Sequence, residues 1–335
     1  MSFLEFFSAA FSQPLGTAVV FITLGVLFVN GWTDAPNAIA AGVSTGAMTL
    51  RQGILLATLM NILGGCTTLL AGRQVAKTMF SLGSFTPGFR GSAALAAALL
   101  SVILWAVIAW RGGIPTSESH GLMAGIMGAA LALGEGGISP LALGKVLVGL
   151  ILSIGMGFLG GWLFSRRFQK KTFRPRVWRN GQIISAALMA FAHGLQDTPK
   201  FASVLILGMT LWGGSGSFSL PFWMLVFCSA AMGLGTLLGG GRIIRTVGSE
   251  MVQIDQKEGF AADLAGTLSL LFSTLQGLPV STTHVKTCAL MGAALGREDG
   301  YVNGKIAASM FGAWLLTFPF CGLLSFLLTR LFLLF

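Results

Sequence analysis

The chain has 335 residues, of which 54% are apolar and only 10% are charged. A soluble domain carries about 25% charged residues, so this composition excludes a soluble globular enzyme, a disordered chain and a disulfide scaffold. It predicts an all-α polytopic membrane protein with about ten hydrophobic segments of roughly 20 residues each. The four cysteines all stand in apolar runs without CxxC spacing, so we expect no disulfide and no metal site built on cysteine. We also expect no cofactor.

The net charge of +10 does not indicate a nucleic-acid partner, because the basic residues are clustered. Seven of the 21 lie within 166–179, a stretch without any acid. In a hydrophobic chain such a stretch marks the cytoplasmic side of the membrane. We therefore expect a first membrane repeat over 1–165, a cytoplasmic basic linker over 166–180 and a second membrane repeat over 181–335.

Uncharged runs predict the membrane segments in chain order. The long runs cover 6–33, 52–72, 91–110, 146–165, 201–241, 264–285 and 306–329. The run at 201–241 is long enough for two crossings, with a break predicted at 213–216. Shorter runs at 35–50, 119–134, 181–196 and 287–296 are rich in Gly, Ala and Ser and predict half-helices or short spans.

Two motifs occur twice in the chain, in the same order. Residues 113–131 (GIPTSESHGLMAGIMGAAL) and 277–295 (GLPVSTTHVKTCALMGAAL) are identical at nine of 19 positions, at an offset of 164. Residues 29–38 (VNGWTDAPNA) and 192–201 (AHGLQDTPKF) form a second pair at an offset of 163. The chain is therefore predicted to be a duplication. The first 50 residues contain no Lys or Arg to hold the N-terminus in the cytoplasm. With a cytoplasmic linker, the first half then crosses an odd number of times and the second half is inverted, with broken or re-entrant helices, as in secondary transporters.

One motif carries an Asp two residues before a proline, Asp34 in the first half and Asp197 in the second. Asp is a good N-cap and proline fits a first turn, so each motif predicts a helix start at membrane depth. Irregular backbone at that depth usually lines a cavity, which makes these carboxylates candidate Na⁺ ligands. Capping alone and proton carriage are the competing interpretations. Further oxygens for a cation come from Thr33, Asn37 and Gln196.

The other motif, PTSESH at 115–120 and PVSTTH at 279–284, places hydroxyls before a helix rich in small residues. A helix N-terminus exposes unpaired N–H groups and a partial positive charge. Two such termini facing each other would bind a tetrahedral oxyanion, unless the hydroxyls only cap their helices. Lys200 and Lys286 would add positive charge, unless they snorkel to the interface. The candidate anion ligands are Ser117, Ser119, Ser281, Thr282, Thr283 and Lys200.

These motifs resemble those of the inorganic phosphate transporter (PiT) family. That family carries a GANDxxNA-like element in its first half, an HGxNDxxK-like element in its second, and P-x-S-x-[ST]-H in each. Here they stand at 31–38, 193–200, 115–120 and 279–284, and the resemblance spans about residues 15–325. It implies uptake of inorganic phosphate coupled to Na⁺ or H⁺, by alternating access, in a homodimeric multi-pass protein of the cell membrane. It places Asp34, Asn37 and Asp197 in the cation and substrate site, and Ser117, Ser281, Thr282 and Thr283 at the anion.

The sequence departs from the family pattern at four positions. Thr33 and Gln196 stand where the family usually has Asn, and Trp32 stands in place of a small residue. Glu118 stands where a small hydroxyl residue is expected. An ionised Glu118 would repel phosphate, so we expect it to pair with a cation or to hold a proton. This leaves Na⁺ or H⁺ as the coupling ion, and sulfate or another oxyanion as the alternative substrate.

An intramembrane hydrolase is a remote alternative. The chain has no GxSxG nucleophile motif, and both halves carry the same polar motifs. Catalysis usually needs unlike roles for its residues, whereas alternating access favours like ones.

Overall fold

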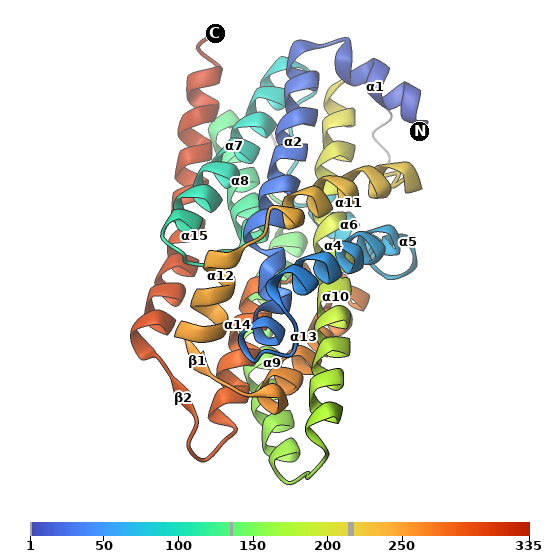
Figure 1. Cartoon of the computed structure of the whole chain (residues 1–335). Helices are drawn as coiled ribbons and strands as arrows, with labels where there is room; N and C mark the ends of the chain where they lie inside the picture. The colour runs from blue at the N-terminus through green and yellow to red at the C-terminus, as the bar shows by residue number, and fades with distance from the viewer. Residues whose placement is uncertain (1, 135–136, 214–217) are drawn as a thin grey trace.

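Helices make up most of the described chain, and α10 and α15 extend along most of the length of the molecule (Figure 1). This computed structural model describes residues 2–134, 137–213 and 218–335. Strands β1 and β2 form one short antiparallel ladder. The elements are α1 (Phe3–Phe11), α2 (Pro14–Thr33), η1 (Ala35–Ile39), α3 (Ala40–Ser44), α4 (Leu50–Cys66), α5 (Thr68–Ala71), α6 (Arg73–Phe80), α7 (Phe89–Arg111), α8 (Glu118–Leu133), α9 (Pro140–Gln169), α10 (Pro175–Leu211), α11 (Phe222–Leu237), α12 (Gly241–Arg245), η2 (Thr246–Glu250), β1 (Val252–Gln253), α13 (Gln256–Leu275), α14 (Thr282–Leu295), β2 (Tyr301–Val302) and α15 (Gly304–Phe332).

Several described helices are long and apolar enough to cross a membrane. There are four of them, and the pair α11 and α12–η2, bent by 68°, would make a fifth. Leu315 on α15 and Ile151 on α9 are 78% and 70% exposed, as side chains facing lipid would be. The four spans cover Pro14–Ser44, Phe89–Arg111, Pro140–Gln169 and Gly304–Phe332.

Four or five continuous helices meet the requirements of length and apolar character, fewer than the about ten hydrophobic segments predicted, partly because several apolar runs are divided between two helices. The run at 52–72 divides between α4 and α5, and the run at 264–285 divides between α13 and α14. Most of the break predicted at 213–216 lies outside the described residues, between the end of α10 and the start of α11. Glycine, serine and proline interrupt helices without lowering the mean hydropathy much, so an uncharged run does not show where a helix is broken.

Two helical hairpins, α7–α8 and α13–α14, turn at the repeated motif. Gly113 and Gly277 have φ angles of +69° and +65°, which only glycine adopts at little cost. A proline follows two residues later, and the next helix begins at Glu118 in one hairpin and Thr282 in the other. The motif therefore sets both the turn and the point where the second helix of each hairpin starts.

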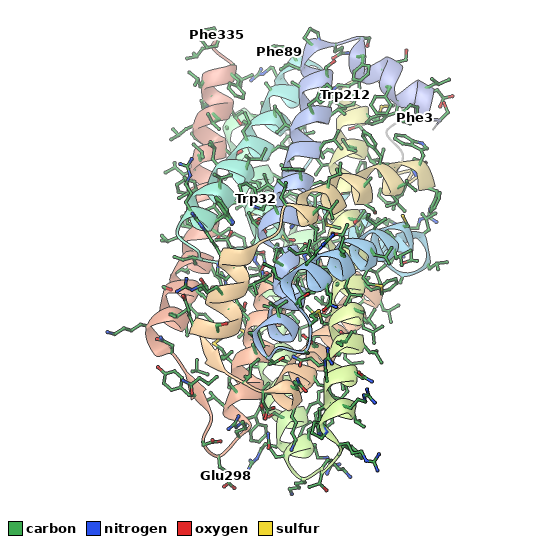
Figure 2. All side chains as sticks on the ribbon, viewed as in Figure 1. Phe3, Trp32, Phe89, Trp212, Glu298 and Phe335 are labelled. Carbon is green, nitrogen blue, oxygen red and sulfur yellow. The ribbon has the colours of Figure 1, made fainter. Side chains whose placement is uncertain are left out.

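The two hairpins come from opposite ends of the molecule. In Figure 1, α7 and α8 lie toward the end that carries both chain termini, and α13 and α14 lie toward the end where α9 turns into α10. In Figure 2, Phe3, Phe89 and Phe335 mark the first end and Glu298 marks the second. This is the arrangement that inverted halves would give, and the symmetry relation itself stays a prediction.

Each hairpin packs into its own apolar cluster. Leu122 and Met123 of α8 belong to a cluster built with α2, α7 and the end of α10. Val285 and Leu290 of α14 belong to a second cluster built with α3, α4 and α13. The first turns of α8 and α14 are polar and meet between these clusters, where the candidate site lies.

Candidate functional site

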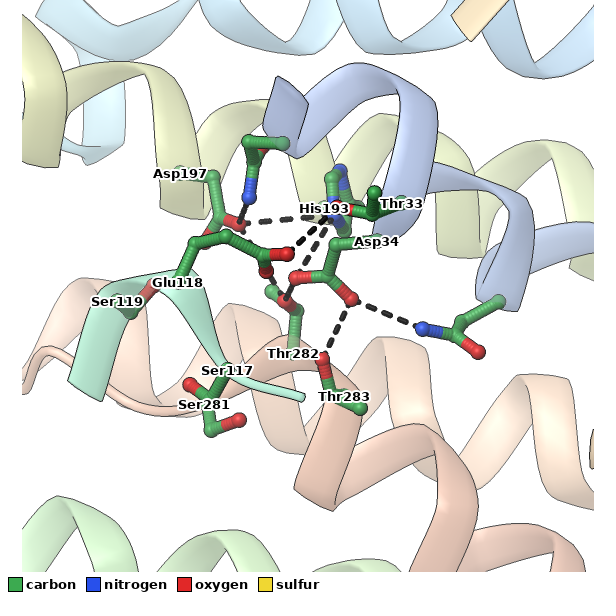
Figure 3. Close-up of polar contacts among 12 residues, drawn as sticks. Thr33, Asp34, Ser117, Glu118, Ser119, His193, Asp197, Ser281, Thr282 and Thr283 are labelled. Carbon is green, nitrogen blue, oxygen red and sulfur yellow. Dashed lines mark hydrogen bonds and ion pairs between the residues drawn. The ribbon is translucent and has the colours of Figure 1, made fainter. Parts of the chain in front are cut away.

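The polar motifs of both halves meet at one buried place, shown in Figure 3. It is bounded by the break between α2 and η1, by the middle of α10 and by the first turns of α8 and α14. Thr283 on α14 reaches the carbonyl oxygen of Thr116, just before α8, with 2.7 Å between the two oxygens. The two helix N-termini are therefore in direct contact, as the repeated hydroxyl motif predicts.

Asp34 occupies the break between α2 and η1 and is 2% exposed. Its Oδ1 accepts hydrogen bonds from Thr283 Oγ1 at 2.5 Å and from Asn37 Nδ2 at 2.9 Å. Its Oδ2 accepts from Thr282 Oγ1 at 2.8 Å. The carboxylate does not cap η1, so the simple capping interpretation does not hold for Asp34. Its partners instead come from η1 and from the start of α14.

Asp197 lies inside α10, and the expectation that it begins a helix is wrong. The helix continues from Pro175 to Leu211 through Pro199. A proline inside a membrane helix is tolerated where neighbouring groups satisfy the backbone, which the local motif cannot reveal. Asp197 accepts hydrogen bonds from Lys200 Nζ at 2.7 Å, Asn30 Nδ2 at 3.2 Å and Thr282 Oγ1 at 3.3 Å.

His193 stands between the two aspartates. Asn61 Nδ2 donates to the carbonyl of Ala57, which turns Asn61 Oδ1 toward His193 Nδ1 at 2.7 Å. Nδ1 must therefore carry the hydrogen. Nε2 then faces Asp34 Oδ2 at 3.6 Å and Asp197 Oδ2 at 3.5 Å. A neutral imidazole would point a lone pair at two carboxylates, so this geometry calls for a positive charge at that point.

The three side chains around that point could hold a cation. One ligand atom each from Asp34, His193 and Asp197 lies within 4.8 Å of the other two. Two carboxylates and an imidazole nitrogen suit a metal ion, and the same place would also accept a proton on Nε2. The amide oxygens of Asn30 and Asn37 are buried and have no hydrogen-bond partner among the described residues. They are further oxygen ligands for a cation.

A third carboxylate, Glu118, lies in the first turn of α8 and is 1% exposed. Its Oε1 is 2.6 Å from Thr33 Oγ1, and its Oε2 has no hydrogen-bond partner within the part of the chain that the structure describes. Thr33 Oγ1 also lies 2.7 Å from the carbonyl of Val29. Glu118 therefore has too few donors around it for a buried ionised carboxylate.

Three threonine hydroxyls in this site each face two acceptors with a single hydrogen. Thr33 faces Glu118 and a backbone carbonyl, and Thr283 faces Asp34 and the Thr116 carbonyl. Thr282 faces Asp34 and Asp197. A hydroxyl donates one hydrogen, so each threonine satisfies one of its two acceptors at a time. Asn37, Asn30 and Lys200 also donate to the aspartates, so the hydroxyls can exchange one acceptor for the other while the carboxylates keep these partners.

The serines of the hydroxyl motif have other partners. The side chains of Ser117 and Ser281 cap their helices by accepting from the N–H of His120 at 3.3 Å and of His284 at 3.2 Å. Ser119 Oγ accepts from Lys200 Nζ at 2.9 Å. The N–H groups that precede these two histidines in α8 and α14 have no intrahelical partner, so they are the candidate donors for an anion.

Lys200 does not present a free charge in this arrangement. Its Nζ donates to Asp197, to Ser119 and to the carbonyl of Val280 at 2.6 Å, which uses its three hydrogens. Lys286 is not brought into the site, because it pairs with Asp263. Neither lysine snorkels, since both are fully buried.

Gln196 lies on α10 but faces away from the carboxylates. Its Nε2 donates to the carbonyl of Leu278 at 2.9 Å and its Oε1 accepts from Thr274 at 2.7 Å. Both partners belong to the α13–α14 hairpin, so Gln196 fixes the hairpin to α10. All the other predicted cation residues, and the predicted hydroxyls, lie at or next to the site.

The sequence reasoning did not identify Asn30 and Asn61. At the offset of 163, Asn30 occupies the first-half position of His193, and Asn37 that of Lys200. The repeat alignment therefore contained a signal for Asn30. Asn61 has no such signal, because it lies in an apolar run outside both motifs and its contact with His193 is made only by the fold.

Comparison with known proteins gives consistent matches. The sequence profile of the phosphate transporter family matches residues 30–175 and 165–325. The chain is 34% identical, over 95% of its length and 96% of the relative, to a protein of Rhizobium meliloti described as a probable low-affinity inorganic phosphate transporter. A Bacillus subtilis protein of the same description is 34% identical, over 90% of this chain and 92% of its own.

A solved structure described as the sodium-dependent phosphate transporter has the same fold. The TM-score is 0.79, and the match covers 96% of this chain and 100% of that one, at 20% identity. The match confirms the prediction of an all-α polytopic membrane protein.

Proposed function

This chain belongs to the phosphate transporter family, and from that premise we propose that it carries inorganic phosphate across the cell membrane together with Na⁺ or H⁺, by alternating access to the central site. Membership confirms the resemblance seen in the motifs and identifies a transporter rather than an enzyme. The relatives' descriptions name inorganic phosphate, which supports phosphate over sulfate for this chain.

The balance of charges in the site carries this proposal. Three buried carboxylates, Asp34, Asp197 and Glu118, stand beside one ammonium, that of Lys200. With His193 neutral, the residues alone would repel an anion. Bound cations or protons reverse that sign, so an oxyanion binds well only after they have bound. Phosphate affinity is therefore coupled to the cation through electrostatics.

The hydroxyls give this coupling a direct mechanism. In the described arrangement the hydroxyls of Thr282 and Thr283 both lie within hydrogen-bond distance of Asp34 and can donate to it. A cation or proton on Asp34 satisfies the carboxylate, so the two hydroxyls are free to turn toward an anion at the N-termini of α8 and α14. As the ions bind, Thr282 and Thr283 therefore change their hydrogen-bond acceptor from Asp34 to the anion.

The membrane potential requires such coupling. A negative interior repels an entering anion by about 2.3 kcal/mol per charge per 100 mV. Phosphate near neutral pH carries one to two negative charges, so two or more accompanying cations are needed to reverse this force. We therefore propose that two or more cations accompany each phosphate and that they bind before the phosphate does.

Uptake of radiolabelled phosphate into proteoliposomes tests the proposal, with Na⁺ and pH gradients imposed separately. We expect saturable uptake that one of the gradients drives and that excess sulfate leaves largely unchanged. Uptake that ignores both gradients would contradict coupling. Inhibition by sulfate as strong as by unlabelled phosphate would favour a general oxyanion permease.

The assembly and orientation complete the proposal. A homodimer, with the 166–180 linker in the cytoplasm, is what the family resemblance and the basic linker support. The molar mass of the purified protein in detergent, measured by light scattering, distinguishes a dimer from a monomer.

A further inference from the structure

A second buried ion pair lies outside the central site. Lys286 on α14 and Asp263 on α13 are both 0% exposed, and Lys286 Nζ donates to Asp263 Oδ1. Asp263 Oδ2 accepts from Ser185 Oγ on α10 at 3.3 Å. Lys286 stands four residues after Thr282, so the two side chains lie on one face of α14, a single turn apart. The pair therefore borders the central site.

The pair lies between the central site and the basic linker. Along α10, Ser185 comes after the linker and before His193, and Gln182 precedes it by one turn. Gln182 is fully buried and accepts from Thr45 Oγ1 at 2.8 Å. Buried polar side chains thus lead from the linker end of α10 toward the carboxylates, with the ion pair beside them.

The first half of the chain has no counterpart of this route. At the repeat offsets, Asp263 corresponds to Leu99 and Lys286 to Leu122, and both leucines are fully buried. The counterparts of Ser185 and Gln182 are Ile22 and Val19. The same fold is therefore built with apolar side chains at these positions. Apolar replacement of a buried ion pair is often neutral or stabilising, so packing does not explain the charges.

Lys286 also has unused capacity to bind an anion. An ammonium has three hydrogens to donate, and Lys200 uses all three on protein partners. Among the described residues, Asp263 is the one hydrogen-bond partner of Lys286 Nζ. The lysine nearest the site is thus saturated, and the lysine one turn away is not.

We propose that the Asp263–Lys286 pair is a second ion site on the route between the central site and the linker end, binding an oxyanion on Lys286 and a monovalent cation or proton on Asp263 in transit. This inference rests on the proposed function. When a buried ion pair separates, both charges stay paired only if each partner binds a counter-ion at the same time. Binding of an anion alone would leave the Asp263 carboxylate unpaired, and binding of a cation alone would leave the Lys286 ammonium unpaired. The pair therefore favours passage of the two ions together.

The test replaces Asp263 and Lys286 with leucine, the residue found at both equivalent positions of the first half. The double variant Asp263→Leu/Lys286→Leu, in the full chain, is compared with the unmodified protein for equilibrium binding of radiolabelled phosphate in detergent and for uptake into proteoliposomes. We expect binding to stay within about twofold, because the central site is intact, and uptake to fall at least about tenfold. The charge-swapped variant Asp263→Lys/Lys286→Asp should recover part of that uptake.

Matched variants keep the outcome decisive. Met189→Leu changes an apolar side chain on α10 and should leave uptake unchanged. If the leucine pair fails to insert, the neutral pair Asp263→Asn/Lys286→Gln replaces it with the same expected result. If either neutral double variant takes up phosphate as fast as the unmodified protein, the inference is overturned. An equal loss of phosphate binding and of uptake also overturns it. If the unmodified protein itself neither binds nor takes up phosphate, the proposed function fails instead.

Discussion

Each aspartate of the site is held by donors from both halves of the chain. Asp34 accepts from Thr282 and Thr283, and Asp197 accepts from Asn30. The repeated motifs allowed both aspartates and the hydroxyls to be predicted as one site, because polar groups that recur at membrane depth rarely occur by chance. The exact pairings could not be predicted, since residues about 250 positions apart are joined only by the fold.

Asp34→Asn tests the cation pocket. The amide removes the charge and turns an N–H₂ group toward hydroxyls that now donate to the carboxylate. An unsatisfied buried group costs about 1–3 kcal/mol, so we expect cation-dependent uptake to fall roughly tenfold or more. Asp197→Asn should act in the same way. Asp299→Asn, on a 75% exposed carboxylate, is the control, and native uptake by the Asp34 variant would exclude it as a ligand.

Glu118→Thr tests whether the third carboxylate holds a proton. The substitution installs the residue found at the matching position of the second half, Thr282. Glu118 lacks donors for an ionised form, so we expect the pH profile of uptake to change when it is replaced. The exposed Glu298→Thr should leave the profile as it is. An unaltered profile for the Glu118 variant would remove this residue from the coupling mechanism.

At the level of elements, the motif glycines allow helices to cross closely. A Cβ on Gly194 would lie 2.1 Å from the carbonyl oxygen of Asn61 on α4. A Cβ on Gly31 would lie 1.9 Å from that of Met232 on α11. These glycines occupy equivalent positions in the two halves, next to Asn30 and His193. Small residues of this kind let membrane helices approach to backbone contact and so position the polar side chains beside them.

Gly194→Ala should push α10 away from α4 and displace His193 from Asn61. Overpacking of this kind costs about 1–3 kcal/mol, so we expect a lower melting temperature in detergent together with reduced uptake. Gly155→Ala on α9 is the matched control, because a Cβ there meets nothing within 4 Å. The control should be neutral or slightly stabilising. Equal behaviour of the two variants would contradict the close-crossing explanation.

Helix boundaries were predictable where the motif contains its own stop signal. The half-helix expected at 119–134 matches α8, since glycine and proline end the preceding turn and a serine caps the next helix. The piece expected at 287–296 covers only the later part of α14, which begins at Thr282 because Ser281 caps it there. The piece expected at 181–196 does not exist separately, because α10 continues through Pro199. Whether a helix absorbs a proline depends on its neighbours, which a local pattern does not contain.

At the scale of the molecule, the charge pattern predicts the orientation in the membrane. The turn from α9 into α10 and the C-terminus lie at opposite ends of the structure (Figure 1). Lys171 in that linker and Phe335 at the C-terminus are both exposed. In a background without the four native cysteines, a membrane-impermeant maleimide applied to intact cells should label Phe335→Cys and not Lys171→Cys. Both should react after the cells are opened. Labelling of Lys171→Cys in intact cells would place the linker outside.

The sharing of donors between the halves has a consequence for the origin of the chain. Thr282 lies within hydrogen-bond distance of the aspartates of both halves. A half-length ancestor with only one copy of each motif would have lacked the donors that each aspartate now takes from the other half. It would have needed a second molecule, set head to foot against the first, before any ion could be held. Fusion of the two genes would then have made permanent a pairing on which the chemistry already depended.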